Sequence, residues 1–561
     1  MKTLPKTDIV IIGLGAAGGI ASYVLTKAGL RVVGIEAGPN RSLGEFIKQM
    51  DEIGGNSYRN QMGEPKFNKE IPTFRPNAQS ANQPLSIAIR MMNGVGGTSV
   101  HYGTQSWRYR DDDFKMRTTT VERYGPQALP DGSAVADWPF GYAELEPYYD
   151  KVEYLIGVSG KGGSNRFESS RARDYPLPPL RSFGYGELAA SAMRTVGYHP
   201  FPQPTAVLSR PYKGRPACSY CGFCSGMGCW NNSKSSTLVT AIAEAEKTGK
   251  LEIRPNSRVM QILADAGGNV TGVQYLDATG QLVEQPASFV ILSTYVYENT
   301  RMLLLSKSKA FPNGLANNHG QVGKYYLSHS YVSVNGLFPG KQLNLYSGTS
   351  GQAVAMDDLN GDHFDHSGLG FIRGSVVFAS NGNLPIGTAS SLAPGAPGWG
   401  SGYKQWLHDN ANSVASLFAQ QETLAYESNF LDLDPKVKDP LGVPVVRITY
   451  DFGANEHKAG AFMAKKLDAL IRAMGASKTW LGFPPIPLPL NSHAYGGTRL
   501  GADPATSVVD QYLIAHDVHN LAIMGGSTFP GTTGYNPTET IEATSWRAAE
   551  HIAANFNTLA V

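Results

Sequence analysis

The sequence predicts an α/β protein, α+β overall, in which a Rossmann-type domain is interleaved with a second domain built on an antiparallel β-sheet. Three observations carry this prediction. A strand, a glycine loop, a helix and a strand follow one another at the N-terminus, alternating apolar and polar residues fill a long middle region, and glycine-rich segments return before a final helix. With 561 residues, the chain is too long for one simple core and suits two domains.

The N-terminal unit begins with residues 8–12, DIVII, which have the composition of a buried parallel strand. The sequence GLGAAG at 13–18 follows directly and opens a helix that Gly29 can end. Residues 31–35 supply the next strand, and Glu36 comes immediately after it. A glycine motif alone is weak evidence in a chain with 63 glycines, but together these elements predict a dinucleotide-binding βαβ unit.

The residues of this unit have separate physical roles. Gly13 permits the tight turn, Gly15 lets a pyrophosphate approach the backbone, and Gly18 lets the helix pack closely on the sheet. The N-terminus of the helix, where Ala17 lies, attracts phosphate charge. Glu36 is placed to bind ribose hydroxyls and to repel a 2′-phosphate, so the predicted ligand is an adenosine diphosphate compound such as FAD or NAD.

A second glycine-rich loop covers residues 94–103, where a lack of side chains lets backbone donors reach a flat or anionic ligand. Farther along, strands are predicted near 258–263, 270–277 and 287–294. The turn sequences AGGN and ATG separate them, so this region is expected to form a β-meander.

Residues 310–485 alternate apolar and polar side chains and predict the antiparallel sheet of a substrate domain. Within this region, residues 384–403 are rich in Gly, Pro, Ser and Ala, so we expect a long exposed loop, either a plain surface insertion or a lid or docking loop. A last helix is expected to run through Ala553. The predicted dinucleotide-binding domain therefore comprises 1–309 and 486–561.

Composition argues against several function classes. Charged residues make up 17% of the chain and the net charge is +2, so there is no basic field for nucleic acid. No apolar stretch approaches the roughly 20 residues needed to span a bilayer. Only a few residues precede the first strand, which leaves no room for a signal peptide. We therefore expect any membrane or export link to come through a partner.

All the cysteines of the chain lie in the run CSYCGFCSGMGC, within an insertion expected at about residues 210–235. Thiolates at this spacing, with glycines between them, can turn toward one point, which suits an iron–sulfur cluster or a zinc ion. Zinc sites usually pair two distant knuckles, so CxxCxxC favours a cluster, and disulfides need less crowded loops. Cluster, zinc and disulfides stay open, in that order, for Cys218, Cys221, Cys224 and Cys229.

The chain resembles the glucose-methanol-choline (GMC) oxidoreductases over nearly its whole length. This resemblance implies an enzyme that binds FAD and oxidises alcohols. It rests on the N-terminal glycine motif, Gly96-Gly97-Thr98-Ser99, Val259, the segment VGKYYLSH that ends at His329, the segment NSHAYGGT that contains His493, and the pair Asn536-Pro537.

The resemblance also implies the site residues. The position of His493 carries the catalytic histidine of the family, and that of Asn536 carries histidine or asparagine. In one relative the histidine that matches His101 is bonded covalently to the flavin, and both a covalent bond and simple packing beside the flavin stay open here. The implied FAD contacts are Gly13, Gly15, Ala17, Gly18, Glu36, Gly97, Thr98, His101, Val259, Gly526, Asn536, Pro537 and Thr538.

The chemistry of alcohol oxidation fits these roles. An alcohol C–H group is not acidic, so oxidation requires a hydride to leave for flavin N5 while the hydroxyl proton goes to a base. Neutral His493 can take that proton, and Asn536 can hold the oxygen without competing for it.

The cysteine run narrows the resemblance to catalytic subunits of bacterial sugar and sugar-acid dehydrogenases, where three cysteines hold a [3Fe-4S] cluster. This branch implies a sugar, sugar-acid or polyol substrate and electron exit through the cluster to a cytochrome-type acceptor. The implied partners are a small export and assembly subunit and a multihaem cytochrome c, and the implied location is the periplasmic face of the inner membrane, with the cytoplasm as alternative. A flavin oxidase with structural cysteines and a non-catalytic electron-transfer or assembly subunit also stay open.

Overall fold

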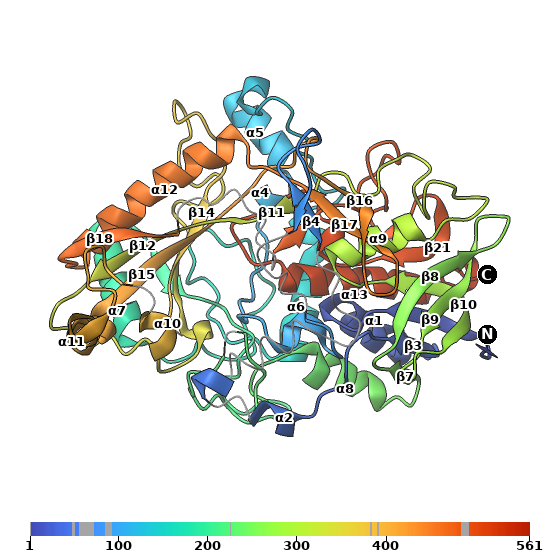
Figure 1. Cartoon of the computed structure of the whole chain (residues 1–561), viewed down its shortest axis with the longest axis horizontal. Coiled ribbons are helices and arrows are strands. Elements are labelled where there is room, and N and C mark those ends of the chain that lie inside the picture. Colours follow the sequence, from blue (N-terminus) through green and yellow to red (C-terminus); the bar gives the residue numbers. More distant parts are fainter. Residues whose placement is uncertain are drawn as a thin grey trace.

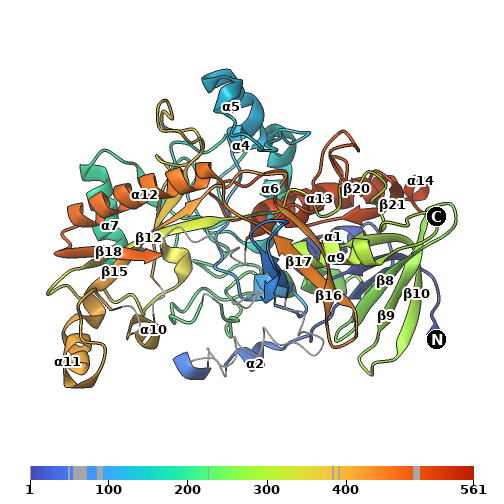
Figure 2. The same ribbon diagram turned by 45° about the horizontal axis from the view of Figure 1, so that its top comes forward.

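The computed structural model describes residues 2–47, 51–54, 72–84, 92–224, 226–381, 384–389, 392–483 and 493–561. Figure 1 shows a body with two ends. Strands β2, β3, β10 and β21 with helices α1 and α13 occupy one end, and strands β12, β15 and β18 with helix α12 occupy the other. The two chain termini lie at the same end of the molecule (Figure 2), and near them the Lys6 ammonium donates to the Val561 carbonyl oxygen at 2.6 Å.

The first sheet has the order β20-β21-β10-β2-β3-β7, and every neighbouring pair in it is parallel except β20–β21. Buried β-branched side chains build its central strands, and the prediction of a Rossmann-type fold is confirmed. Helix α1 packs against α13 and α8. The elements are β2 (Thr7–Ile12), α1 (Ala16–Lys27), β3 (Val32–Ile35), α8 (Ala241–Glu246), β7 (Leu251–Arg254), β10 (Leu282–Leu292), β20 (Ile514–Ala515), β21 (Val518–Ile523) and α13 (Thr538–Ala554).

The predicted meander is present as β8 (Arg258–Ala264), β9 (Val270–Leu276) and β10, with β1 (Lys2–Thr3) added beside β10. The third strand begins at Leu282, five residues before the predicted start at Ala287. Strand β10 belongs to both the meander and the parallel sheet, because its residues 282–286 pair with β9 and its residues from 287 onward pair with β2. The first half of the strand contains Glu284, Gln285 and Pro286, which hid its beginning from the sequence pattern.

The second large sheet has the order β18-β12-β15-β14-β13-β6 and is antiparallel throughout, as predicted for the second domain. Helices α12 and α7 pack against it, with Val332, Leu417, Met463 and Leu467 buried between the layers (Figure 1). The predicted residue bounds of the domains stay predictions. The elements are β6 (Pro200–Pro202), α7 (Gly184–Thr195), β12 (Ser330–Leu337), β13 (Val354–Met356), β14 (Ser375–Ala379), β15 (Val414–Gln421), α12 (Ala454–Ala473) and β18 (Lys478–Phe483).

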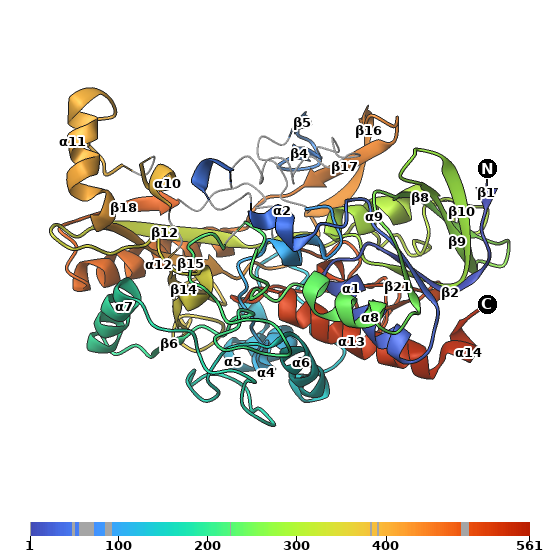
Figure 3. The ribbon, with the colours of Figure 1, turned by 90° about the horizontal axis from the view of Figure 1, so that it is seen from below.

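The expectation of a loop over 384–403 is wrong in part. The structure has helix α10 (Pro385–Ala389) and helix α11 (Gly400–Asn410), and α11 stands away from the body at one edge of the molecule (Figure 3). The glycine-rich start of α11 masked the helix-forming residues that follow it, KQWL, and proline is favourable at the first position of α10. Residues 390 and 391 lie outside the described part of the chain.

Smaller elements connect these layers. A mixed sheet joins segments from both ends of the sequence, in the order β16-β17-β4-β5. No helix in the described ranges is long and apolar enough to cross a membrane. The remaining elements are α2 (Leu43–Ile47), β4 (Thr73–Arg75), β5 (Gln83–Pro84), α4 (Asp111–Phe114), α5 (Met116–Tyr124), α6 (Tyr142–Ile156), α9 (Val296–Leu305), β11 (Leu327–Ser328), β16 (Phe430–Lys438), β17 (Pro444–Thr449), β19 (Ala494–Tyr495) and α14 (Phe556–Leu559).

Candidate active site

Several residues predicted to bind the dinucleotide meet at the carboxyl edge of the parallel sheet. Gly13 follows β2, Glu36 follows β3, and Gly526 lies just after β21. Ligands of open parallel sheets bind at this edge. The fold therefore brings together three residues that are far apart in the sequence.

The two glycine loops lie against each other at this edge, with no room for side chains. A Cβ atom on Gly18 would lie 2.1 Å from the carbonyl oxygen of Gly13, which itself has a φ of 86°. A Cβ atom on Gly97 would lie 2.8 Å from the Cα of Gly15. Thr98 belongs to the same short turn as Gly97. The loops form a cradle lined by backbone, which suits a pyrophosphate.

The carboxylate of Glu36 is buried and held by the backbone. One oxygen accepts the N–H of Leu14 at 3.0 Å, and the other accepts the N–H groups of Gly38 and Gly94 at 2.9 and 3.0 Å. Burial raises the pKa of Glu36, and these N–H groups oppose the rise. A carboxylate offers about four lone-pair positions, so a ribose hydroxyl can still bind, and the site fits the adenosine end of FAD.

The other predicted cofactor residues come from separate elements. His101 is neutral, because burial, followed by the charges of Lys234 and Arg41, lowers its pKa well below the ordinary value of 6.5. The set consists of Ala17 in α1, His101 after the turn at residues 97–100, Val259 in β8, and Pro537 and Thr538 at the start of α13.

A short ladder places two histidines side by side. Strand β11 pairs with β19 so that Ser328 lies opposite Ala494. His329 follows the first strand and His493 precedes the second, and their Nδ1 atoms are 2.9 Å apart. The sequence pointed to His329 only as part of a family segment and did not predict this contact, because the pairing of two-residue strands leaves no periodic pattern.

His493 has a polar neighbour at each ring nitrogen. Its Nε2 atom lies 3.1 Å from Nδ2 of Asn536, and its Nδ1 atom lies 2.8 Å from the hydroxyl of Tyr331. Desolvation by the surrounding protein lowers the pKa of His493 to about 4, so the ring is neutral at pH 7. The structure thus brings the two predicted catalytic residues within hydrogen-bond distance of each other.

Donors fix the orientation of the Asn536 amide. The indole N–H of Trp107 donates to Oδ1 of Asn536 at 3.2 Å, and the amide nitrogen of Gln420 donates to the same oxygen at 3.4 Å. Gln420 is itself oriented because it also donates to the carbonyl oxygen of Gly534 at 2.9 Å. Since Oδ1 faces donors, the NH₂ group of Asn536 faces His493.

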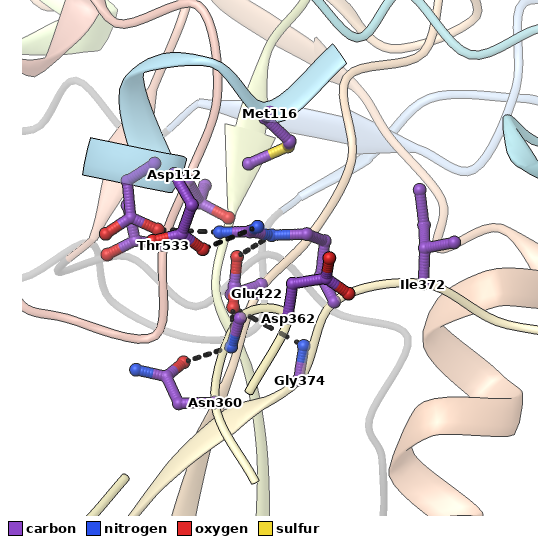
Figure 4. A network of polar contacts seen from close by, with 12 residues as sticks. Asp112, Met116, Asn360, Asp362, Ile372, Gly374, Glu422 and Thr533 are labelled. Carbon is purple, nitrogen blue, oxygen red and sulfur yellow. Dashed lines mark hydrogen bonds and ion pairs between the residues drawn. The ribbon is translucent and has the colours of Figure 1, made fainter. Parts of the chain in front are cut away.

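A buried ionic network lies beside the loop that carries Asn536. The Arg373 guanidinium donates to Glu422 at 2.7 Å, to Asp113 at 2.6 Å and to Asp112 at 3.1 Å, and the backbone of Gly374 donates to Glu422 at 3.4 Å (Figure 4). Burial raises the pKa of Glu422 to about 7, although the charge of Arg373 pulls it down. No sequence motif pointed to this network.

The network is connected to the segment that carries Asn536 by neighbouring residues of the backbone. Glu422 directly follows β15, which contains Gln420, and the next residue, Thr423, donates its N–H to the hydroxyl of Thr532 at 2.8 Å. The Thr532 hydroxyl returns a hydrogen bond to the Thr423 carbonyl at 2.9 Å. The ion pairs therefore support the segment that carries Asn536.

A small, partly open pocket borders the same region. Trp107 and Tyr535, whose rings stack with centroids 4.7 Å apart, form part of its lining, and so do Arg108 and Arg171. Both arginines bind Glu153, at 2.8 and 2.5 Å, which fixes them in the wall. No sequence motif predicted this pocket.

The four cysteines are free, half-buried thiols, so the disulfide alternative does not hold in this structure. Burial, together with the nearby charges of the other three thiols, raises the pKa of Cys218 to about 12, and the N–H of Tyr220 opposes the rise. The Thr349 hydroxyl donates to the sulfur of Cys224 at 3.0 Å, and the N–H of Tyr220 donates to that of Cys218 at 3.4 Å.

The thiols are not arranged as a ligand set. Among the residues that the structure describes, no group of three or more His, Cys, Asp or Glu side chains is placed to hold a metal ion. The prediction of an iron–sulfur cluster or zinc ion is thus not supported by this geometry. The loop does adjoin the cofactor cradle, since the N–H of Gly226 donates to the His101 carbonyl at 2.8 Å.

Comparison with known proteins gives consistent matches. Family models described as GMC oxidoreductase match residues 205–330 and 425–545. The gluconate 2-dehydrogenase flavoprotein of Pantoea cypripedii is 32% identical, over 99% of this chain and 94% of that protein. The fructose dehydrogenase large subunit of Gluconobacter japonicus is 29% identical, over 98% of each.

A solved structure shares the fold. Pyridoxine 4-oxidase from Mesorbium loti aligns with a TM-score of 0.62 over 97% of this chain and 99% of that one. Because the sequence identity is 15%, this match supports the fold and gives no information about the substrate.

Proposed function

The chain belongs to the GMC oxidoreductase family, whose members are FAD-dependent enzymes acting on CH–OH donors, and we propose that it is a dehydrogenase that oxidises an alcohol group of a sugar, sugar acid or polyol. The observation that carries the proposal is the pairing of His493 Nε2 with the NH₂ group of Asn536, which lies just before helix α13, a helix that packs against α1.

The hydrogen bonds determine which nitrogen of His493 acts as the base. An indole N–H can only donate, so Trp107 makes Oδ1 of Asn536 an acceptor. The NH₂ group of Asn536 then donates to Nε2 of His493. Nε2 therefore holds a lone pair, and the ring proton is on Nδ1.

A substrate hydroxyl that enters between these two side chains replaces one hydrogen bond with two. It donates to Nε2 of His493 and accepts from Nδ2 of Asn536. His493 removes the hydroxyl proton while Asn536 holds the oxygen that becomes a carbonyl. FAD, when bound, accepts the hydride from the substrate carbon. A general base of this kind contributes about 10²–10⁴ in rate.

The substrate class rests on the relatives. Two of the curated proteins that match nearly the whole chain are named for gluconate and for fructose, which are a sugar acid and a sugar, and a third is named for 2-methyl-1,2-propanediol, a diol. His493 and Asn536 bind only the reacting hydroxyl, so they suit any of these alcohols.

Electrons leave, in our proposal, through an iron–sulfur cluster held by the cysteine run. Support comes from the gathering of four free thiols, from the donors to the sulfurs of Cys218 and Cys224, and from the link between Gly226 and the cofactor cradle. The thiols must turn toward one point when iron binds, since none of the described groups is pre-arranged for a metal.

The proposal extends to the partners and the location. Resemblance to sugar-acid dehydrogenases supports a complex with a small export and assembly subunit and a multihaem cytochrome c, on the periplasmic face of the inner membrane. A one-electron carrier suits a cluster, whereas an oxidase would have no use for one.

Replacing Cys224 with serine is expected to abolish the paramagnetic signal of the cluster and the steady reduction of a cytochrome c acceptor. Substrate should still reduce the flavin in a single turnover, because hydride transfer does not involve the thiols. The wild type should form little peroxide with oxygen. Iron content, paramagnetic resonance and the two steady-state rates are the measurements.

Ser219→Ala, at an exposed position in the same run, is the matched control and should keep all four properties. Wild-type protein without iron that forms peroxide as fast as it turns over would make the chain a flavin oxidase. Loss of folding in the Cys224 variant would indicate a structural metal instead.

A further inference from the structure

We infer that His329 is a positioning residue that holds His493 in the tautomer a base requires. This inference rests on the proposed role of His493. His329 is fully buried and is anchored by the β11–β19 ladder, which fixes its ring roughly perpendicular to that of His493, at an interplanar angle of 87°.

The far side of His329 determines its own tautomer. Its Nε2 atom lies 2.7 Å from the carbonyl oxygen of Thr533, which can only accept, so Nε2 carries a proton. The Tyr495 hydroxyl makes a longer contact to the same nitrogen, at 3.3 Å. Burial, followed by the charge of His493, lowers the pKa of His329 well below 6.5, so the ring is neutral. Its Nδ1 atom therefore has a lone pair and no proton.

The proton in the contact between the two rings can then belong to only one of the two Nδ1 atoms. Two Nδ1 atoms 2.9 Å apart must share one proton, because two lone pairs would repel and two N–H groups would clash. Since Nδ1 of His329 has no proton, Nδ1 of His493 donates. This leaves the lone pair of His493 on Nε2, which faces Asn536.

Two independent ends of the chain of hydrogen bonds give the same tautomer. The carbonyl of Thr533 determines it through His329, and the indole of Trp107 determines it through Asn536. When His493 takes the substrate proton at Nε2, its Nδ1–H remains bonded to His329. His329 thus stabilises the imidazolium as a neutral acceptor.

Tyr331 is the other neighbour of the same nitrogen, with its hydroxyl 2.8 Å away and its side chain half-buried. It does not determine the tautomer, because a hydroxyl can both donate and accept.

The test uses FAD-loaded variants in anaerobic stopped-flow experiments with a substrate of the wild type. His329→Leu should slow flavin reduction by roughly 10- to 100-fold, the effect of losing a hydrogen bond to a charged group, with little change in the substrate dissociation constant. His329→Asn keeps an acceptor near the position of Nδ1 and should recover most of the loss. His408→Gln, at a surface histidine whose side chain is 81% exposed, is the control and should stay within about threefold of the wild type.

Each outcome is decisive. If His329→Leu stays within about threefold of the wild type, or if the Asn and Leu variants are equally slow, His329 has no positioning role. If His493→Gln leaves the rate of flavin reduction intact, the proposed function itself fails. Should His329→Leu not bind FAD, His329→Asn and His329→Gln decide, because the Asn amide lies near the position of Nδ1 and the Gln amide near that of Nε2, so only the Asn variant should be nearly normal. Equal rates in these two variants would show that His329 has no positioning role.

Discussion

Replacing His493 with glutamine is expected to slow flavin reduction by about 10²–10⁴ while FAD stays bound. Glutamine is similar in size and can still accept from Asn536, but it has no basic nitrogen to take the substrate proton. The FAD cradle is built by the loops at Gly13 and Gly97 and does not use His493. The rate of flavin reduction should therefore fall while the FAD content stays unchanged. Stopped-flow absorbance measures the rate, and the absorbance ratio of flavin to protein measures the FAD content.

His408→Gln is the control, because this histidine is on the surface with its side chain 81% exposed, and it should leave the rate unchanged. A His493 variant that keeps more than about a tenth of the wild-type rate would rule out a general base at this position. Loss of FAD together with activity would point to a structural role instead.

Arg373→Met is expected to lower the free energy of unfolding by about 3–5 kcal/mol. The guanidinium pairs with Glu422, Asp112 and Asp113 in a buried region. Its loss leaves Glu422 without its ion-pair partner and leaves the two aspartates with Arg110 as their one neighbouring cation in the ion pairs of the described residues. Urea unfolding, followed by circular dichroism, measures the change. The Asn536 loop rests on this network, so flavin reduction should slow as well.

The matched control is Arg472→Met, which removes an arginine from the surface of α12. Its ion pair with Asp468 has a similar distance, 2.8 Å, but the side chains are 58% and 40% exposed, so the loss should stay below about 1 kcal/mol. Equal losses in the two variants would show that the buried network does not carry the stability assigned to it.

The local sequence pattern predicted those helices and strands whose signal lies within one continuous segment of the chain. The strand at residues 8–12, its glycine loop and the helix that follows all have short-range signals, and the structure places them as expected. The same is true of the alternating strands between residues 330 and 483. The start of β10 and the helices at 385–389 and 400–410 were missed, because polar or glycine-rich residues there obscure the period.

The sequence predicted which residues form the site, but it did not predict how their side chains are arranged. His493 and Asn536 came from a family resemblance, and their contact is a result of tertiary structure. His329 and Arg373 act through partners more than 40 residues away, which no local pattern reveals. The cysteine spacing indicated a metal, yet spacing does not determine where the sulfur atoms point, and the described geometry leaves the cluster a proposal.

Anaerobic mixing of the FAD-loaded protein with a panel of gluconate, fructose, glucose and simple polyols is the most direct test of the proposed alcohol dehydrogenase. The flavin absorbance is recorded, and dithionite provides full chemical reduction. We expect at least one member of the panel to bleach the flavin completely, with a rate that saturates with concentration. If dithionite bleaches the flavin and none of these alcohols does so, the chain is not a sugar, sugar-acid or polyol dehydrogenase.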